Sequence, residues 1–367
     1  MTDNDAVPDD VDVRGLGTEP DVDDDATIDP EPVPFKYDIT SRGADYPVDG
    51  LVKRIRGGGL KIPGFQRQYV WKKRQADRFI ESLLLGLPVP GIFLADDPDS
   101  GRLVLDGQQR LRTLQYFYDN RWGARSRFAL SYVQEQFRGL TYETLDPPDR
   151  DRLDDYEIHA TIVKQNQPSE DQSSVFFVFE RINSGGTPLA EQEIRSALYQ
   201  GPLNDLLVDL NADERWRRVF GKPSPRLKDQ ELILRFLALH YERQLYKRPM
   251  KDFLNKFMGR HRRLRGVTAE DMRAVFVGTI DVIDKALGTG AFRPKAAVNA
   301  AVFDSTMVGV STRLSRGPIT DPSTVTLAYF ELLRDEEYVT AYTRATADED
   351  RLATRIDLAI SAFSGAV

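Results

Sequence analysis

The hydrophobic periodicity of this chain changes at Gly185-Gly186. Before these glycines, short apolar stretches rich in β-branched residues alternate with amphipathic helical segments, a pattern typical of a mixed α/β domain. After them, the apolar residues recur with the spacing of amphipathic helices. We therefore predict an α+β chain, with a small α/β domain over residues 35–200 and an all-helical domain over residues 201–367.

The first 34 residues differ in composition from both domains. They contain 12 acidic side chains and one basic side chain, Arg14. Such a segment cannot bury enough apolar surface to offset its ordering entropy, so we predict that residues 1–34 form a disordered acidic tail. The tail either solubilises the protein or mimics nucleic-acid charge and competes for a basic groove.

The remaining residues are close to neutral, although the whole chain has a formal net charge of −7. They carry 49 Lys and Arg against 45 Asp and Glu, which excludes a histone-like binder and leaves room for local basic patches. The chain has no cysteine, which excludes disulfide scaffolds and thiolate metal sites. No apolar run approaches the roughly 20 residues that span a bilayer. We expect a cytoplasmic protein without a membrane partner.

The pattern is detailed enough to place individual elements. Helices are predicted at 47–56, at 72–85, from 108 onward and at 173–182, and strands at 60–62, 91–95, 102–105 and 157–163. A capping box, Ser169-Glu170-Asp171-Gln172, precedes the helix at 173–182. Helical periodicity then covers 189–199, 202–210, 227–247, 250–260, 268–287, 296–315, 322–335 and 347–363.

Common active-site patterns are absent from the sequence. There is no G-x-x-x-x-G-K-[ST] phosphate loop, no G-x-G-x-x-G after a strand and no G-x-S-x-G elbow. The only histidines are His159, His240 and His261, which are widely separated and lack the spacing of metal ligands. We interpret each histidine as a structural or surface residue.

The segment Asp106-Gly107-Gln108-Gln109-Arg110 lies where a predicted strand turns into a helix. The first turn of a helix offers unpaired backbone N–H groups and the positive end of a dipole, which together favour an anion such as phosphate. Asp106 could then hold a divalent cation or orient a water. The alternative is a polar turn in which Asp106 caps the helix and Arg110 pairs with an acid.

Two other segments contain polar residues that local structure does not fully explain. Aromatics alternate with Gln and Arg over residues 63–71, either to stack a base and bind a phosphate or to anchor the core through Tyr69 and Trp71 with Arg67 in an ion pair. Helix capping explains most of residues 181–189, but it does not explain Arg181 and Asn183.

Together the three segments resemble the N-terminal domain of the GmrSD-type restriction endonucleases, a ParB-like family with an Asp-Gly-Gln-Gln-Arg motif. The resemblance spans about residues 45–240, and Phe65 stands where relatives often have Tyr. It implies a nucleoside-triphosphate-binding and hydrolysing domain in prokaryotic defence against foreign or modified DNA. The implied catalytic residues are Asp106, Gln108, Gln109 and Arg110, with Mg²⁺ at Asp106. The implied nucleotide-binding residues are Gln66, Arg67, Gly107, Arg112 and Asn183.

Many relatives carry a separate histidine-dependent nuclease domain, and this chain has no such histidine cluster. If DNA is cut, we expect a partner nuclease to cut it, with a methyltransferase subunit as another possible partner. Two alternatives to a nucleotide-dependent sensor stay open: a metal-dependent DNA phosphodiesterase that nicks DNA itself, and a non-enzymatic adaptor.

The densest basic run lies in the predicted helical domain, at residues 256–265. Its arginines, Arg260, Arg262, Arg263 and Arg265, are candidates for contacts with DNA phosphates. The alternative is an ordinary solvated helix surface.

Overall fold

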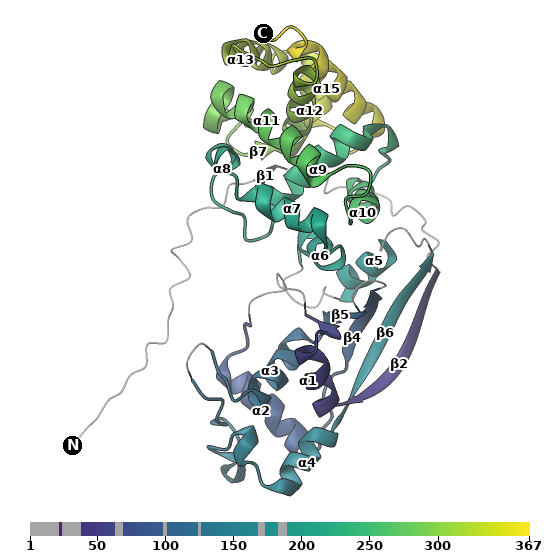
Figure 1. The fold of residues 1–367 in the computed structure, drawn as a ribbon, viewed down its shortest axis with the longest axis vertical. Helices are drawn as coiled ribbons and strands as arrows, with labels where there is room; N and C mark the ends of the chain where they lie inside the picture. Colours follow the sequence, from purple (N-terminus) through teal and green to yellow (C-terminus); the bar gives the residue numbers. More distant parts are fainter. Residues whose placement is uncertain are drawn as a thin grey trace, which may run out of the picture. The chain divides into compact units, whose positions relative to one another are not determined.

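The computed structural model describes residues 22–23, 38–62, 69–97, 101–123, 126–167, 173–182 and 189–367. The chain divides into two compact units, which we call the sheet unit and the helical unit (Figure 1). The sheet unit comprises Glu31–Asp205 and Leu254–Arg265, and the helical unit comprises Met1–Pro30, Leu206–Phe253 and Gly266–Val367. Helices and strands of both units confirm the predicted α+β class.

The sheet unit is built on a five-stranded mixed sheet with the order β2-β6-β4-β5-β3. Its strands are β2 (Asp38–Pro47), β3 (Leu60–Lys61), β4 (Ile92–Asp97), β5 (Gly101–Asp106) and β6 (Glu157–Gln167). Its helices are α1 (Val48–Arg56), α2 (Lys73–Leu84), α3 (Gln108–Tyr118), α4 (Pro147–Asp155), α5 (Ser173–Ile182) and α6 (Glu191–Leu198). The pairs β4–β6 and β3–β5 are parallel, whereas β2–β6 and β4–β5 are antiparallel.

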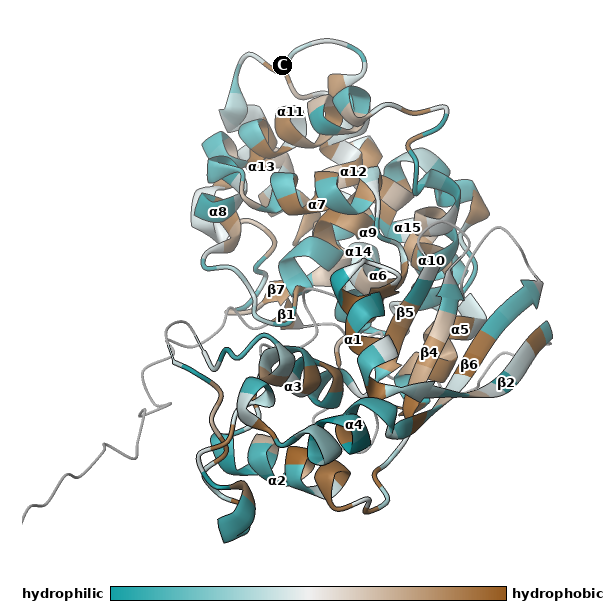
Figure 2. Ribbon diagram, turned by 60° about the horizontal axis from the view of Figure 1, so that its bottom comes forward, coloured by the Kyte–Doolittle hydropathy of each residue, from teal (hydrophilic) through white to brown (hydrophobic). Residues whose placement is uncertain are grey.

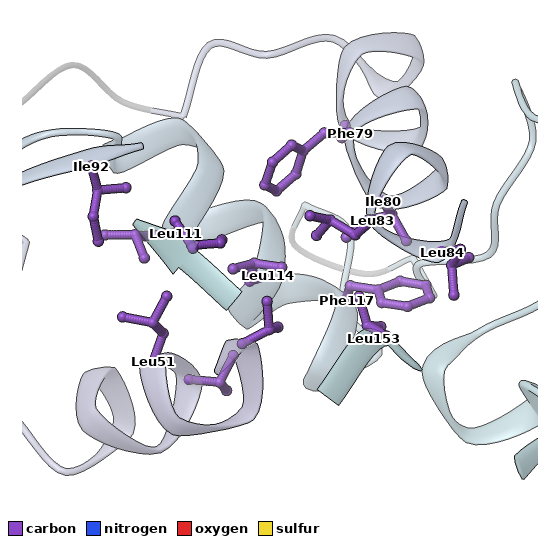
Figure 3. Close-up of a cluster of buried hydrophobic side chains, with 14 of the residues drawn as sticks. Leu51, Phe79, Ile80, Leu83, Leu84, Ile92, Leu111, Leu114, Phe117 and Leu153 are labelled. Carbon is purple, nitrogen blue, oxygen red and sulfur yellow. The ribbon is translucent and has the colours of Figure 1, made fainter. Parts of the chain in front are cut away.

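The core of the sheet unit lies between one face of the sheet and helices α1 to α4. Helix α2 buries residues at the spacing of one helical face, including Ala76, Phe79, Ile80 and Leu83. Figure 3 shows this face meeting the buried leucines and Phe117 of α3. The packed core therefore holds α3, and with it the turn that precedes α3, against the sheet.

The predicted elements of the sheet unit are confirmed to within a few residues, and α5 has the predicted bounds. Two elements, β2 and α4, were not expected. Strand β2 is mostly exposed along its length and is defined by its pairing with β6, a contact between segments more than 100 residues apart. Helix α4 buries only Leu153. The capping box at 169–172 lies outside the described residues.

The helical unit is formed by helices predicted from their periodicity, together with two short ones that were not. Its helices are α7 (Pro202–Asn211, most of which lies in this unit), α8 (Glu214–Phe220), α9 (Lys228–Glu242), α11 (Ala269–Leu287), α12 (Ala300–Leu314), α13 (Pro322–Leu332), α14 (Glu336–Thr343) and α15 (Glu349–Phe363). The sequence had not indicated α8 and α14. Helix α10 (Met250–His261) has residues in both units. None of the described helices is long and apolar enough to cross a bilayer.

Part of the predicted tail is ordered. Val22–Asp23 form strand β1, which pairs in parallel with β7 (Val298–Asn299) of the helical unit. We had expected these two residues to be disordered. They form a strand because the backbone of β7 supplies their hydrogen-bond partners. The rest of residues 1–34 lie outside the described residues.

The division into units also differs from a boundary at residue 200. Residues 201–205 belong to the sheet unit, and so does the returning segment Leu254–Arg265. Two hydrogen bonds explain why the segment Leu254–Arg265 belongs to the sheet unit. Arg195 Nε donates to Asn255 Oδ1 over 3.0 Å, and Arg262 Nε donates to the carbonyl of Gln200 over 2.7 Å. Because Arg195 and Asn255 are fully buried, this segment is part of the interior of the sheet unit.

Candidate functional site

The turn between β5 and α3 has a fixed backbone. Gly107 has φ +95°, a conformation that disfavours residues with a side chain. A Cβ atom at this position would lie 2.4 Å from Cγ2 of Ile92, so there is no room for one. Asp106 and the first turn of α3 are therefore held in one arrangement by the close approach of β4.

Arg110 ties the turn to the neighbouring strand. Its Nη2 atom donates to Asp106 Oδ2 and to the carbonyl of Gly91, each over 2.9 Å. Gly91 in turn has no space for a side chain, because a Cβ would lie 2.7 Å from the carbonyl oxygen of His159. The Asp106 side chain keeps 45% of its surface exposed, while that of Arg110 keeps 15%. The site therefore presents a carboxylate that is oriented by a guanidinium and still open to solvent.

The alternative interpretation of the turn had two parts: Asp106 caps the helix, and Arg110 pairs with an acid. The structure contains the second of them. Arg110 does pair with an acid, and that acid is Asp106 itself. The side chain of Asp106 is not the N-cap of the helix, because the N-cap residue is Gly107, which has no side chain. The positive end of the α3 dipole therefore receives no capping side chain from its own N-cap residue.

The two glutamines of the turn have different surroundings. Gln108 is buried, with 9% of its surface exposed. The Oε1 atom of Gln109 accepts hydrogen bonds from the backbone N–H groups of Val70 and Trp71, over 3.0 and 3.3 Å. Gln109 therefore fixes the backbone of the aromatic segment beside the turn.

Arg112 follows one helical turn after Gln108. Its Nε atom is buried, and within the described chain the side chain makes no hydrogen bond and no ion pair. A buried donor of a charged group without a partner costs free energy. Arg112 is thus a cation whose partner is not supplied by the described residues.

Tyr69 and Trp71 are packing residues, as one of the two interpretations of the aromatic segment expects. The ring of Tyr69 packs edge-on against Tyr116 and Trp122, and its hydroxyl lies 2.7 Å from Oγ1 of Thr113. Burial raises the pKa of Tyr69 to about 12, so its hydroxyl stays protonated at neutral pH. Trp71 packs edge-on against Phe79.

Three of the expected nucleotide-binding residues, Gln66, Arg67 and Asn183, lie outside the described residues. The structure therefore brings together Asp106, Gly107, Gln108, Gln109, Arg110 and Arg112 at the start of α3. Sequence reasoning missed Gly91, and it missed the backbone of Val70 and Trp71 as partners of the turn. Their only sequence signal is a glycine at the first position of a predicted strand.

The basic run at residues 256–265, which begins in the last turns of α10, is only partly exposed. Arg260, Arg263 and Arg265 are exposed, whereas Arg262 is half-buried and binds the carbonyl of Gln200. The carbonyl of Arg262 also accepts a hydrogen bond from the N–H of Leu203. Arg262 therefore has a structural role, and any contact of this run with DNA stays a prediction.

Within the described residues, no group of three or more acidic or histidine side chains is placed to hold a metal ion. His159 lies on the sheet surface with Nδ1 2.7 Å from Oδ1 of Asp45, and His240 lies 3.0 Å from Oγ of Ser311. Burial lowers the pKa of His240, so this ring is neutral near pH 7.

Residues 48–200 match the family model described as the GmrSD restriction endonuclease, N-terminal domain. This region belongs to that family. The GmrSD-type domain contains the whole turn at residues 106–110 and ends within the sheet unit. Membership implies a component of a restriction-type system that acts on DNA, and a nuclease as its partner domain. No curated protein matches the chain.

Proposed function

We propose that the GmrSD-type domain binds and hydrolyses a nucleoside triphosphate, and that the protein is the nucleotide-dependent sensor of a restriction system whose cutting is done by a partner nuclease. The observation that carries this proposal is the accessible carboxylate of Asp106. It is oriented by Arg110 at the start of a helix whose N-cap residue is a glycine. Phosphate groups favour such helix starts.

Each residue of the turn has a role in this proposal. The first-turn N–H groups of α3 and Arg112 bind phosphate oxygens, which gives the buried Nε of Arg112 a partner. Arg110 holds Asp106 in place, and Gln108 orients the nucleotide or the attacking water. Gln109 acts as a positioning residue through Val70 and Trp71. Gln66, Arg67 and Asn183 complete the nucleotide contacts by the family resemblance.

Asp106 fits a magnesium ion that arrives with the nucleotide. Proteins commonly hold Mg²⁺ with one or two carboxylates plus phosphate oxygens and waters, so a single exposed carboxylate is a sufficient protein ligand. When bound, Mg²⁺ would neutralise charge on the phosphates. The carboxylate of Asp106 would fix where the nucleotide phosphates lie.

The test is hydrolysis of GTP, ATP and CTP by the purified protein with Mg²⁺. Asp106→Asn keeps the size of the side chain and removes its charge, so we expect turnover to fall by about 100-fold or more. Asp45→Asn is the matched control, because Asp45 is another exposed carboxylate with a side-chain hydrogen-bond partner, His159. We expect that variant to hydrolyse nucleotide at the wild-type rate.

Two further variants, Arg110→Ala and Arg112→Met, distinguish the orientation of the Asp106 carboxylate from the binding of the nucleotide phosphates. We expect Arg110→Ala to lower kcat, and Arg112→Met chiefly to raise KM. Equal rates in the wild type and Asp106→Asn would contradict the proposal, as would the absence of nucleotide binding. Binding without turnover would favour the adaptor, and nicking of plasmid DNA with Mg²⁺ or Mn²⁺ would favour the phosphodiesterase.

A further inference from the structure

A set of exposed cations lies along α2 and the hairpin that follows α3. We call it the α2 seam, and it consists of Lys72, Arg74, Arg78, Arg121 and Arg127. All five side chains belong to the sheet unit. They are outside the turn at residues 106–110 and outside the basic run at 256–265.

The seam is built by a chain segment that lies beside α2. Three side chains of α2, spaced one helical turn apart, bind this segment: Lys73, Asp77 and Glu81. Lys73 Nζ donates to the carbonyl of Ala129 over 2.7 Å. Asp77 Oδ2 accepts from the N–H groups of Ser131 and Tyr132, and Glu81 Oε1 accepts from that of Gln134.

These contacts occupy the acids of α2. Asp77 is fully buried and also pairs with Lys73, whose ammonium lies 4.6 Å from the ring centre of Phe128. Burial lowers the pKa of Lys73, and Asp77 opposes that shift. The carboxylate of Asp77 therefore binds only interior partners and does not neutralise the exposed arginines of the seam.

No carboxylate of the described chain lies within 4.0 Å of any cation of the α2 seam. Some other exposed arginines of the same unit do have acidic partners, such as Asp119 for Arg56 and Glu135 for Arg138. Arg74 and Arg78 are four residues apart on one helix face, where like charges repel each other and reduce helix stability. Figure 2 shows α2 as hydrophobic toward the core and hydrophilic on its other side.

The seam also carries exposed hydrophobic and neutral polar groups. Tyr132 and Val70 are each 56% exposed. Ser126 and Gln75 are exposed and uncharged. A set of exposed cations with neutral polar neighbours and no carboxylate of the described chain within 4.0 Å fits a repeating anion, as the phosphate backbone of a nucleic acid provides.

We propose that the α2 seam contacts the phosphate backbone of double-stranded DNA. The proposal rests on the part of the proposed function that the family supports, action on DNA, and is independent of nucleotide hydrolysis. Contacts of this kind fix the position of a protein on the duplex without reading its sequence. The seam would hold DNA against the GmrSD-type domain whatever modification the system senses.

The test measures binding of the full chain to a fluorescent 20-base-pair duplex over a range of salt concentrations. We compare the wild type with the triple variant Arg74→Ser, Arg78→Ser, Arg127→Ser. The slope of log K against log salt is negative, and each lost phosphate contact lowers its magnitude by about 0.9, so we expect this magnitude to fall by about 2 to 3. At 0.1 M salt the triple variant is expected to bind at least about tenfold more weakly.

The matched control is Arg316→Ser, Arg334→Ser, Arg344→Ser, three exposed arginines of the helical unit with no acidic partner in the described chain. This control removes the same charge and is expected to keep the wild-type slope. Nucleotide hydrolysis without DNA is measured in parallel, and the seam variant should retain the wild-type rate. If the wild type does not hydrolyse nucleotide, the proposal of nucleotide hydrolysis is overturned and the proposal for the α2 seam is not affected.

Three results would overturn the seam proposal: no binding of the duplex by the wild type, an unchanged slope in the seam variant, or an equal loss in the control. Equal affinity for double-stranded RNA, or for an acidic peptide of residues 1–34, would also overturn it. The seam would then be a general anion surface. Thermal unfolding of both triple variants checks that each remains folded.

Discussion

Gly107 shows how one residue type sets the geometry of the candidate site. Its positive φ angle and its approach to Ile92 are two independent reasons for a residue without a side chain. The first reason concerns the backbone of the turn, and the second concerns the packing of β4 on the turn. A substitution at this position therefore tests both together.

We predict that Gly107→Ala lowers the free energy of unfolding by more than about 2 kcal/mol. The positive φ contributes about 1–2 kcal/mol, and the overlap with Ile92 contributes about 1–3 kcal/mol. Gly86→Ala is the control, because Gly86 has φ +70° but no atom within 4 Å of the added Cβ. Urea unfolding measures both losses. Equal losses would mean that β4 moves to accommodate the methyl group.

The sequence predicted the local part of this site and missed the long-range part. A strand end, a glycine and a helix start are neighbours in the chain, so the turn at residues 106–110 was predictable. The bond of Arg110 to Gly91 and those of Gln109 to Val70 and Trp71 join residues 19, 39 and 38 positions apart. Such partners are brought together only by the tertiary packing of the strands and helices, which no local pattern specifies.

At the scale of elements, a buried ion cluster joins three helices of the helical unit. Asp304 of α12 receives two hydrogen bonds from Arg235 of α9, over 3.1 and 2.7 Å, and lies 3.6 Å from Nη2 of Arg355 of α15. Asp304 and Arg355 are fully buried. Burial lowers the pKa of the Arg355 guanidinium, and Asp304 opposes this shift. One carboxylate is therefore the shared counter-charge of two interior guanidinium groups.

We predict that Asp304→Asn lowers the free energy of unfolding by about 3–5 kcal/mol, because both guanidinium groups lose their counter-charge in the interior. Asp209→Asn is the control, since Asp209 forms an exposed pair with Arg273 over 3.1 Å. That change should cost less than about 1 kcal/mol. Chemical denaturation of the two variants gives the comparison. Similar small losses in both variants would contradict the assigned role of the cluster.

The two elements of the sheet unit that the sequence missed share a physical cause. Strand β2 and helix α4 bury few side chains, so they lack the periodic apolar pattern on which prediction depends. Helix α5 has an uninterrupted apolar run and was predicted at its observed bounds. Elements that are fixed by tertiary pairing rather than by their own hydrophobic face can be recognised only in the folded chain.

At the scale of the whole molecule, the sheet unit is discontinuous in sequence. Its interior includes Asn255, which accepts a hydrogen bond from the fully buried Arg195. The matched family region ends at residue 200 and lacks this partner. A buried guanidinium that loses a hydrogen-bond partner destabilises the fold.

We predict that a chain of residues 31–205 alone does not unfold cooperatively. Joining residues 254–265 to it through a flexible Gly/Ser linker should restore a cooperative transition, because the linked segment returns Asn255 to Arg195. Circular dichroism during heating measures both chains. The same linked chain with Asn255→Ala is the control and should regain less stability. Cooperative unfolding of residues 31–205 without the segment would contradict the prediction.

The returning segment has a consequence for how such proteins can evolve. A domain that is continuous in sequence can pass between genes with two breakpoints, one at each end. Here, any exchange that carries only residues 48–200 would separate Arg195 from Asn255 and leave the new host without the segment that fills the interior. The GmrSD-type domain of this chain and the start of its helical unit are therefore expected to be inherited as one piece.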